Sequence, residues 1–182
     1  RTEVCPIQFL PDDVLEYILA SVSQYADLEN CALVGKRWRR CVINVIWQRQ
    51  RGFLKAVPEM SLVWSSNEKL DRSLDEANVI TKRYCHSACF HDATSTMFVF
   101  GGCTSTSTTF NDLWRLDLTN RRWSRPLAMG TYPSPKACAS MVIDSDALYL
   151  FGGWTHPSLY PLHQSWRLFN ELHVYDIGQS RW

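Results

Sequence analysis

Several features that would assign this 182-residue chain to a familiar class of protein are missing. No stretch approaches the roughly 20 apolar residues that cross a bilayer, and the N-terminal residues contain no signal-peptide core. A strong charge of either sign is also missing, because 19 Lys and Arg residues stand against 18 Asp and Glu residues. This balance argues against a basic nucleic-acid-binding protein and an acidic tail. We therefore expect neither a nucleic acid nor a membrane as partner.

Disulfide-forming patterns are scarce as well. The seven cysteines are an odd number, no two have C-x-x-C spacing, and no Asn-x-Ser/Thr site occurs. These features favour reduced thiols and an intracellular protein, cytoplasmic or nuclear. Cys85 and Cys89, with His86 and His91 beside them, raise the possibility of zinc, but no second half-site follows. We instead expect both cysteines to be small buried residues of one strand, and we expect no metal and no cofactor.

Aromatic residues, by contrast, are abundant, with eight Trp, eight Phe and seven Tyr. In residues 10–57 the apolar residues recur at helical spacing and predict three short helices. The first begins after Pro11, the second begins at Asp27, and the third begins near Gly35 with a basic, solvated side around Trp38. About 45 residues is close to the lower limit for an independent core. We therefore expect part of the apolar face to be offered to a neighbour.

The second half of the chain has a different period and contains an internal repeat. Residues 97–102 recur as 148–153 after 51 positions, and residues 111–113 recur as 170–172 after 59 positions. Each repeat holds four short strand signals, which is typical of one blade of a β-propeller. Because propellers usually close with four to eight blades and the chain begins with Arg1 rather than Met, we expect a fragment.

The predicted fold class is therefore α+β in separate domains. A small all-α domain precedes an incomplete β-propeller of about two blades, each with four antiparallel strands. The predicted boundaries are 6–57 for the helical domain, 58–84 for a linker, and 85–182 for the propeller fragment, with repeats at about 85–135 and 136–182. We expect structural roles for the residues that recur between the repeats: Gly101, Gly102, Asp117, Trp123, Gly152, Gly153, Tyr175, Asp176 and Trp182.

These two patterns resemble a known family. The run Leu-Pro-Asp-Asp-Val-Leu-Glu-Tyr-Ile-Leu at 10–19, with Ala-Leu-Val at 32–34 and Lys-Arg-Trp-Arg-Arg at 36–40, resembles an F-box. The Gly-Gly, Tyr-Asp and Trp spacing resembles kelch repeats. The resemblance implies a non-catalytic substrate receptor of an SCF-type ubiquitin ligase. In that family the F-box docks on the Skp adaptor, which joins cullin and RING subunits, and the propeller binds a protein substrate.

The resemblance also assigns residues to the adaptor surface. The positions that match the docking motif are Leu10, Pro11, Leu15, Ile18, Leu28, Val34 and Trp38. Two other functions stay open at this point. One is a kelch scaffold that works without ubiquitin. The other is a propeller enzyme, for which we find no candidate set of ligands.

One loop is the candidate substrate surface. The loop after the second Gly pair, residues 154–169, is eight residues longer than its counterpart at 103–110. Rigid aromatic side chains make good recognition anchors at low entropic cost. The candidates are Trp154, His156, Tyr160 and His163. The alternative is that the aromatic residues pack on a neighbouring blade and only stiffen the loop.

Overall fold

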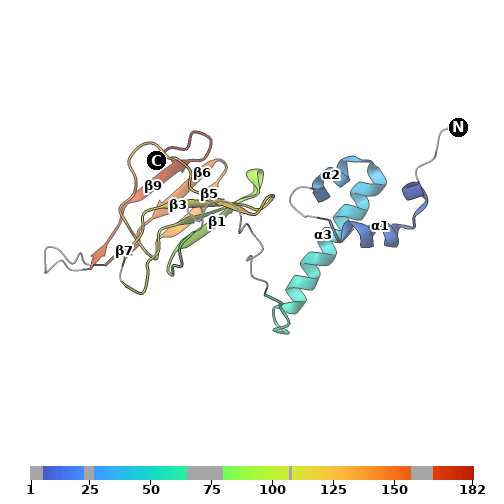
Figure 1. The fold of residues 1–182 in the computed structure, drawn as a ribbon, viewed down its shortest axis with the longest axis horizontal. Helices are drawn as coiled ribbons and strands as arrows, with labels where there is room; N and C mark the ends of the chain where they lie inside the picture. The colour runs from blue at the N-terminus through green and yellow to red at the C-terminus, as the bar shows by residue number, and fades with distance from the viewer. Residues whose placement is uncertain (1–5, 23–26, 65–79, 107, 157–165) are drawn as a thin grey trace. The chain divides into compact units, whose positions relative to one another are not determined.

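The computed structural model describes residues 6–22, 27–64, 80–106, 108–156 and 166–182. The chain divides into two compact units, Arg1–Lys69 and Leu70–Trp182, which are described separately below. The first is helical and the second is built from antiparallel sheets (Figure 1). This confirms the predicted fold class. None of the described helices is long and apolar enough to cross a membrane.

Three α-helices form the first unit, after a short 3₁₀ turn, η1 (Pro6–Phe9). They are α1 (Asp12–Leu19), α2 (Asp27–Leu33) and α3 (Lys36–Ala56). Pro11 stands at the N-cap of α1, and the carboxylates of Asp12 and Asp13 lie in its first turn, where the helix dipole favours negative charge. The predicted starts of all three helices therefore follow from local signals.

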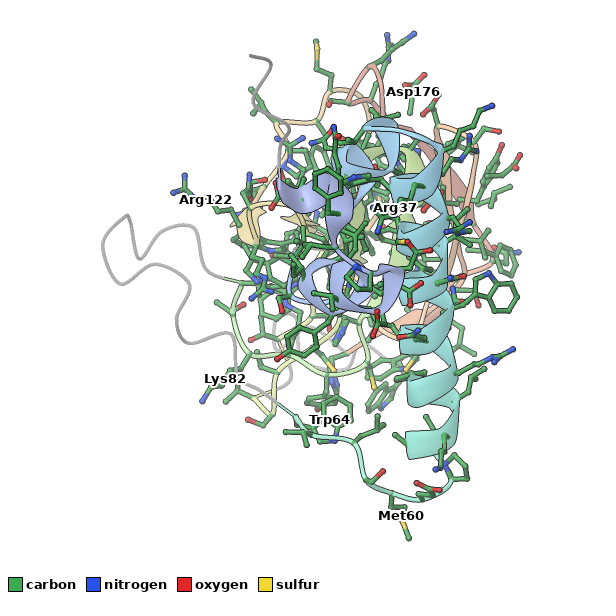
Figure 2. All side chains as sticks on the ribbon, turned by 90° about the vertical axis from the view of Figure 1, so that its right-hand side faces the viewer. Arg37, Met60, Trp64, Lys82, Arg122 and Asp176 are labelled. Carbon is green, nitrogen blue, oxygen red and sulfur yellow. The ribbon has the colours of Figure 1, made fainter. Side chains whose placement is uncertain are left out.

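The core of the helical unit is formed by α1 and α2 packing on α3. Its fully buried members are Leu15, Leu19, Leu28, Cys41, Val42 and Val45. All the buried residues of α3 lie in its N-terminal half. In the turn that follows α3, the side chain of Met60 points away from the helix, and Met60 and Trp64 are almost fully exposed (Figure 2).

The first sheet of the second unit is a four-stranded antiparallel meander. It contains β1 (Ser87–His91), β2 (Thr96–Phe100), β3 (Leu113–Asp117) and β4 (Arg122–Ser124) in that spatial order. The 3₁₀ turn η3 (Asp92–Thr94) joins β1 to β2. Ser87 pairs with Phe100, and Phe100 pairs with Leu113, so β2 is paired along its whole length on both sides. This is the predicted single blade.

The second sheet repeats three of these strands. They are β5 (Ser140–Asp144), β6 (Ala147–Phe151) and β9 (Leu172–Asp176), in the order β5-β6-β9. At the position of the expected fourth strand, Arg181 forms only isolated bridges to Met129 and Asp176. A small ribbon of β7 (Trp154–Thr155) and β8 (Arg167–Leu168) lies within the segment predicted as a loop.

The two sheets pack face to face through apolar side chains. The buried cluster between them consists of Phe98, Phe100, Leu113, Leu148, Leu150 and Tyr175. Ring contacts join the sheets at Phe98 and Tyr175, with centroids 6.4 Å apart, and at Phe100 and Trp182, with centroids 5.6 Å apart. The strands nearest each other are β1 and β5. This arrangement is that of two neighbouring propeller blades.

The expectation that Cys85 is buried in a strand is wrong. β1 begins at Ser87, and Cys85 precedes it in a turn with a φ of +54°. The turn directs the residue outward, and Cys85 is exposed. Cys89 lies within β1 and is half-buried between the two sheets, close to the expectation for it.

Candidate functional site

Helix α1 carries two apolar faces. Leu15 and Leu19 are fully buried against the other helices, as the i, i+4 spacing requires. Val14, Tyr17 and Ile18 lie on the other side, with Tyr17 78% exposed and Ile18 41% exposed. We call these three residues the outer face of α1. A short helix with apolar residues on both sides leaves one side for another molecule.

The seven predicted docking residues fall into three classes of burial. Pro11, Ile18 and Val34 are exposed. Leu10 and Trp38 are half-buried. Leu15 and Leu28 are fully buried in the helical core, so they support the surface from below instead of lying on it. Three exposed apolar residues that the motif match did not include are Phe9, Tyr17 and Leu33.

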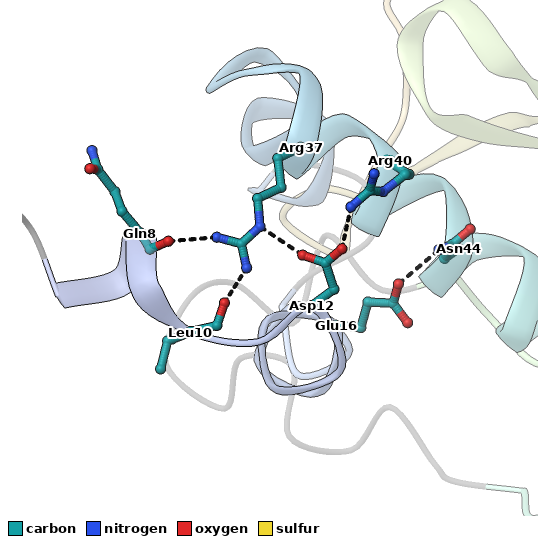
Figure 3. A network of polar contacts seen from close by, with 7 residues as sticks. All are labelled: Gln8, Leu10, Asp12, Glu16, Arg37, Arg40 and Asn44. Carbon is teal, nitrogen blue, oxygen red and sulfur yellow. Dashed lines mark hydrogen bonds and ion pairs between the residues drawn. The ribbon is translucent and has the colours of Figure 1, made fainter.

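A polar network fixes α1 against the start of α3 (Figure 3). The Arg37 guanidinium donates to the Asp12 carboxylate at 2.7 Å and to the backbone carbonyls of Gln8 and Leu10. Arg40 donates to the second oxygen of Asp12. One arginine therefore holds both the first turn of α1 and the residues just before it.

The next turn of α1 is held in the same way. The side-chain amides of Asn44 and Gln48 donate to the two Glu16 carboxylate oxygens at 2.8 and 3.2 Å. Arg49 donates to the backbone carbonyls of Ala20 and Val22, at the end of α1 and beyond it. These contacts set the orientation in which α1 presents its outer face.

The basic side of α3 is therefore not simply the solvated surface that its sequence predicts. Arg37 and Arg49 are half-buried and bind backbone carbonyls, and Arg40 pairs with Asp12. Hydrogen bonds from Arg37, followed by those from Arg40, lower the pKa of Asp12, although desolvation opposes them. A signal for this network was present, because Asp12 and Glu16 are spaced i, i+4 and so are Arg40 and Asn44.

The glycine pairs of the propeller unit allow a close backbone approach. Gly102 and Gly153 have φ values of +90° and +88°, a region that favours glycine. A Cβ atom on Gly102 would lie 2.8 Å from the Tyr84 carbonyl oxygen, and one on Gly153 would lie 2.8 Å from that of Ala137. Gly101 and Gly152 also have positive φ. The matching geometry supports the structural role predicted for both pairs.

The remaining repeated residues lie in turns and between the sheets. Asp117 accepts hydrogen bonds from the backbone of Thr119 and Asn120, and Asp176 accepts one from the backbone of Gln179. Tyr175 and Trp182 are in ring contact at 5.1 Å. Trp123 is half-buried on β4 opposite Leu116. These side chains therefore lie in the turns, the strands and the ring contacts of the propeller unit.

The base of the long second loop carries an aromatic cluster. Trp154, His156 and Trp166 contact one another with ring centroids between 4.6 and 4.9 Å apart. Trp154 pairs through its backbone with Ala137, and the His156 amide donates to the Thr109 hydroxyl of the first loop at 3.4 Å. Trp154 and His156 are half-buried, whereas Trp166, which sequence reasoning missed, is 59% exposed. The other two candidates, Tyr160 and His163, lie outside the described residues.

Sequence reasoning also missed a charged cluster that recurs in both repeats. In the first, Arg83 lies over the Phe110 ring at 4.3 Å and pairs with Asp112 at 2.6 Å, and Asp112 also accepts from the Trp114 indole. In the second, the cluster consists of Lys136 over the Phe169 ring at 4.4 Å, Glu171 at 3.5 Å from Lys136, and His173 beside Glu171. In each blade, therefore, a basic side chain lies over an aromatic ring and pairs with a carboxylate.

The two clusters differ in how deeply the carboxylate is placed. The Arg83 and Asp112 side chains are 3% and 12% exposed, whereas Glu171 is 39% exposed beside a fully buried Lys136. Burial opposes ionisation of Asp112, but hydrogen bonds from Arg83 and Trp114 outweigh it and lower its pKa. Burial lowers the pKa of Lys136, and Glu171 counteracts this. Both clusters lie where a loop enters a strand, because Asp112 directly precedes β3 and Glu171 directly precedes β9.

Two family profiles match the chain. The profile described as "F-box-like" matches residues 7–51, which contain the three-helix core and the polar network. The profile described as "FBX42, beta-propeller domain" matches residues 83–182, more than half of the chain. The chain belongs to the FBX42 beta-propeller family. The packed sheets belong to an FBX42-type propeller domain, and the helices before them form an F-box-like domain.

Curated relatives share the repeats at moderate identity. Over 113 residues, 57% of this chain, it is 30% identical to Host cell factor 2 of Homo sapiens. Over 71 residues, 39% of this chain, it is 37% identical to Dynein regulatory complex subunit 7 of Chlamydomonas reinhardtii. Over 101 residues, 55% of this chain, it is 33% identical to Kelch domain-containing protein 3 of Bos taurus. The matched segments span only 14%, 6% and 24% of those relatives.

An F-box-like domain followed by an FBX42-type propeller is the domain order of a substrate-recognition adaptor. In general, an F-box-like domain implies binding of a Skp-type adaptor. In the described parts of the chain, no group of three or more His, Cys, Asp or Glu side chains is arranged to hold a metal ion.

Proposed function

We propose that this chain is the substrate-recognition subunit of an SCF-type ubiquitin ligase. The helical unit docks on the Skp adaptor, which joins it to cullin and RING subunits, and the propeller unit holds a protein substrate. The observation that carries the proposal is the outer face of α1, which stays exposed although the opposite face of the same helix is fully buried. The F-box-like match over residues 7–51 supports it.

The energetics of the outer face suit a stable docking contact. Burying a large apolar side chain contributes about 1.5–3 kcal/mol, so Tyr17 and Ile18 together could supply several kcal/mol. The Arg37–Asp12 pair, at 2.7 Å, holds α1 in place before binding. A helix that is already oriented loses less conformational entropy on binding. Pro11, which is also exposed, borders the same helix.

The receptor contributes to ubiquitin transfer by holding two proteins together. Effective concentration alone can lower the barrier by several kcal/mol without a reacting group on this chain. The aromatic cluster of Trp154, His156 and Trp166 offers the propeller a rigid anchor for substrate, with the exposed Trp166 ring as its accessible part. Aromatic side chains are enriched among residues that dominate binding energy.

Co-purification with a Skp adaptor tests the docking surface. Wild-type chain should form a stable complex, and Ile18→Asp or Tyr17→Asp should weaken the complex at least tenfold, because each places a charge in an apolar interface. The matched control is Leu127→Asp, an exposed apolar residue of the propeller unit. The proposal fails if wild type does not bind the adaptor, or if the α1 variants bind as well as the control.

A second candidate function is a propeller scaffold that joins proteins without ubiquitin transfer. The likeness to Dynein regulatory complex subunit 7, a protein named for the complex it belongs to, favours this alternative. A reconstituted ubiquitylation reaction separates the two functions. Loss of substrate ubiquitylation on removal of this chain supports the ligase, whereas retained partner binding with no ubiquitin transfer supports the scaffold.

A further inference from the structure

Two cysteines occupy the same position in the two blades and are joined by a backbone hydrogen bond. Cys85 lies two residues before β1, and Cys138 lies two residues before β5. The Cys138 backbone amide donates to the Cys85 carbonyl at 2.8 Å. Residues joined by a backbone hydrogen bond lie at about the Cα separation that a disulfide spans. The repeat therefore pairs the backbones of two cysteines that are 53 positions apart in the sequence.

The backbone at both positions is of a kind that favours glycine. Cys85 has a φ of +54° and Cys138 has a φ of +53°. Residues with a side chain are uncommon there, because the Cβ atom crowds the backbone. The chain uses cysteine at both positions, although glycine would fit the backbone with less strain. Backbone strain of this kind is a reason to look for a use of the side chain.

Exposure separates this pair from the other cysteines that the structure describes. Cys85 and Cys138 are exposed, whereas Cys41 and Cys103 are buried and Cys31 and Cys89 are half-buried. Burial raises the pKa of Cys89 to about 11, which suppresses its thiolate. Among these six cysteines, only Cys85 and Cys138 combine exposure to solvent with a backbone hydrogen bond to a cysteine of the other blade.

We propose that Cys85 and Cys138 form a reversible disulfide by exchange with a small disulfide such as oxidised glutathione. The thiolate of one cysteine attacks a glutathione sulfur, breaking its S–S bond and releasing one glutathione thiolate. The second cysteine thiolate then attacks the protein-side sulfur of this mixed disulfide and releases the other glutathione. Two protein thiols are oxidised, one glutathione disulfide is reduced, and two protons pass to the glutathione thiolates.

The disulfide would join the blades at the end that carries their loops. Tyr84, next to Cys85, pairs with Cys103 at the start of the first loop. Ala137, next to Cys138, pairs with Trp154 at the start of the second loop. Any effect of oxidation on substrate binding rests on the proposed function, but formation of the disulfide does not.

The rate of exchange should be modest at neutral pH. The Cys138 thiol, followed by desolvation and then by the nearby Cys103, raises the pKa of Cys85 above its usual value. A raised thiol pKa leaves little thiolate near neutrality, so the attacking species is scarce. We therefore expect the disulfide to form under a sustained excess of oxidised glutathione, over minutes to hours.

The experiment uses the folded 182-residue chain. It is incubated with oxidised glutathione, free thiols are alkylated, and disulfide-linked peptides are quantified by mass spectrometry without reduction. The Cys85–Cys138 peptide pair should exceed any other cysteine pair at least tenfold and should disappear on treatment with a reducing agent. Free Cys85 and Cys138 after oxidation, or a predominant link between other cysteines, would overturn the proposal.

Two variants keep the test independent of folding. Cys138→Gly removes one thiol but tolerates the positive φ, so the fold is retained and Cys85 should accumulate only as a mixed disulfide with glutathione. Cys89→Ser, the matched control, should form the Cys85–Cys138 link at the wild-type rate. If Cys89→Ser abolishes the link, the assignment is wrong. Adaptor co-purification under reducing conditions is unaffected in either case, so failure here is distinct from failure of the proposed function.

Discussion

The helical unit and the propeller unit place their charged contacts at different depths. In the helical unit, Arg40 and Asp12 form an ion pair at the surface, with Arg40 64% exposed. In the propeller unit, Arg83 and Asp112 are almost completely withdrawn from water. A surface pair contributes at most about 1 kcal/mol, whereas breaking a buried pair leaves an uncompensated charge. The same chemistry therefore links two helices at the surface of one unit and lies inside the other.

Both units also combine buried and exposed apolar residues. The helical unit keeps a fully buried inner face on α1 and exposes an outer face of comparable character. In the propeller unit, Phe98 and Phe100 on the first sheet are buried against the second sheet. The second sheet nevertheless leaves Val142, Phe151 and Leu172 exposed. What distinguishes the helical unit is that one short helix carries both a fully buried and an exposed apolar face.

The largest effect is expected when the buried cation of the first blade is removed. Arg83→Ala would leave the Asp112 carboxylate buried without its main partner, and such a change costs about 3–5 kcal/mol. The propeller unit should lose most of its cooperative unfolding transition in denaturant titrations that are followed by Trp fluorescence.

The control for this prediction is Arg167→Ala in the second blade. Arg167 lies 3.9 Å from Glu171, and both side chains are partly exposed. Its removal should change the free energy of unfolding by less than about 1 kcal/mol. Equal effects of the two substitutions would show that depth of burial does not distinguish the two clusters.

The next largest effect separates the two faces of α1. Leu15→Ala should destabilise the helical unit by about 2–5 kcal/mol, because it opens a cavity in a small core. Tyr17→Ala should change stability by less than about 0.5 kcal/mol, because Tyr17 is exposed. Far-UV circular dichroism during thermal unfolding measures both.

Adaptor binding should rank these variants in another order. Tyr17→Ala should weaken binding while the helical unit stays folded, and Leu15→Ala should weaken binding only at temperatures where the unit unfolds. If Tyr17→Ala destabilises the unit as much as Leu15→Ala, then the outer face is part of the core and the comparison drawn above fails.

The helices, the glycine pairs and the family could be predicted from the sequence, because their signals lie in short stretches of the chain. The helix starts at Asp12, Asp27 and Lys36 lie at or next to Pro11, Asp27 and Gly35, where the sequence predicts them from residue type and the spacing of apolar residues. The glycine pairs were found because they recur at one fixed offset, 51 positions. The family resemblance rested on those same local patterns, and the family profiles bear it out.

Contacts between distant segments could not be predicted in the same way. Arg83 and Asp112 are 29 positions apart and lie on either side of β1 and β2, so only the fold brings them together. Lys136 follows its counterpart Arg83 by 53 positions, whereas Glu171 follows its counterpart Asp112 by 59 positions. Because the two offsets differ, comparing the repeats at one fixed offset does not reveal the pair. Cys85 was misplaced for a related reason. Cys85 has a positive φ just before β1, so it does not continue the alternation of the strand and is exposed. The spacing of apolar residues in the sequence does not reveal such a change in the backbone.

The smallest expected effect concerns the surface network of the helical unit. Hydrogen bonds from Arg37 and Arg40 lower the pKa of Asp12, so its folded-state pKa lies below its unfolded value. A carboxyl group shifted in this direction contributes stability above the unfolded pKa, about 3.9, and loses it as the pH falls through the folded pKa. The helical unit should therefore keep this contribution at neutral pH and lose it only in acid below about pH 4.

Thermal unfolding followed by far-UV circular dichroism at a series of pH values tests this dependence. Asp12→Asn keeps the shape of the side chain but removes its charge, so the variant should have a lower unfolding temperature than wild type near neutrality and should converge with it in acid. Asp13→Asn is the matched control, since Asp13 is the exposed neighbour in the same helical turn. Parallel pH profiles for wild type and Asp12→Asn would mean that the Arg37 and Arg40 contacts do not orient α1, and that the outer face is held in place by core packing alone.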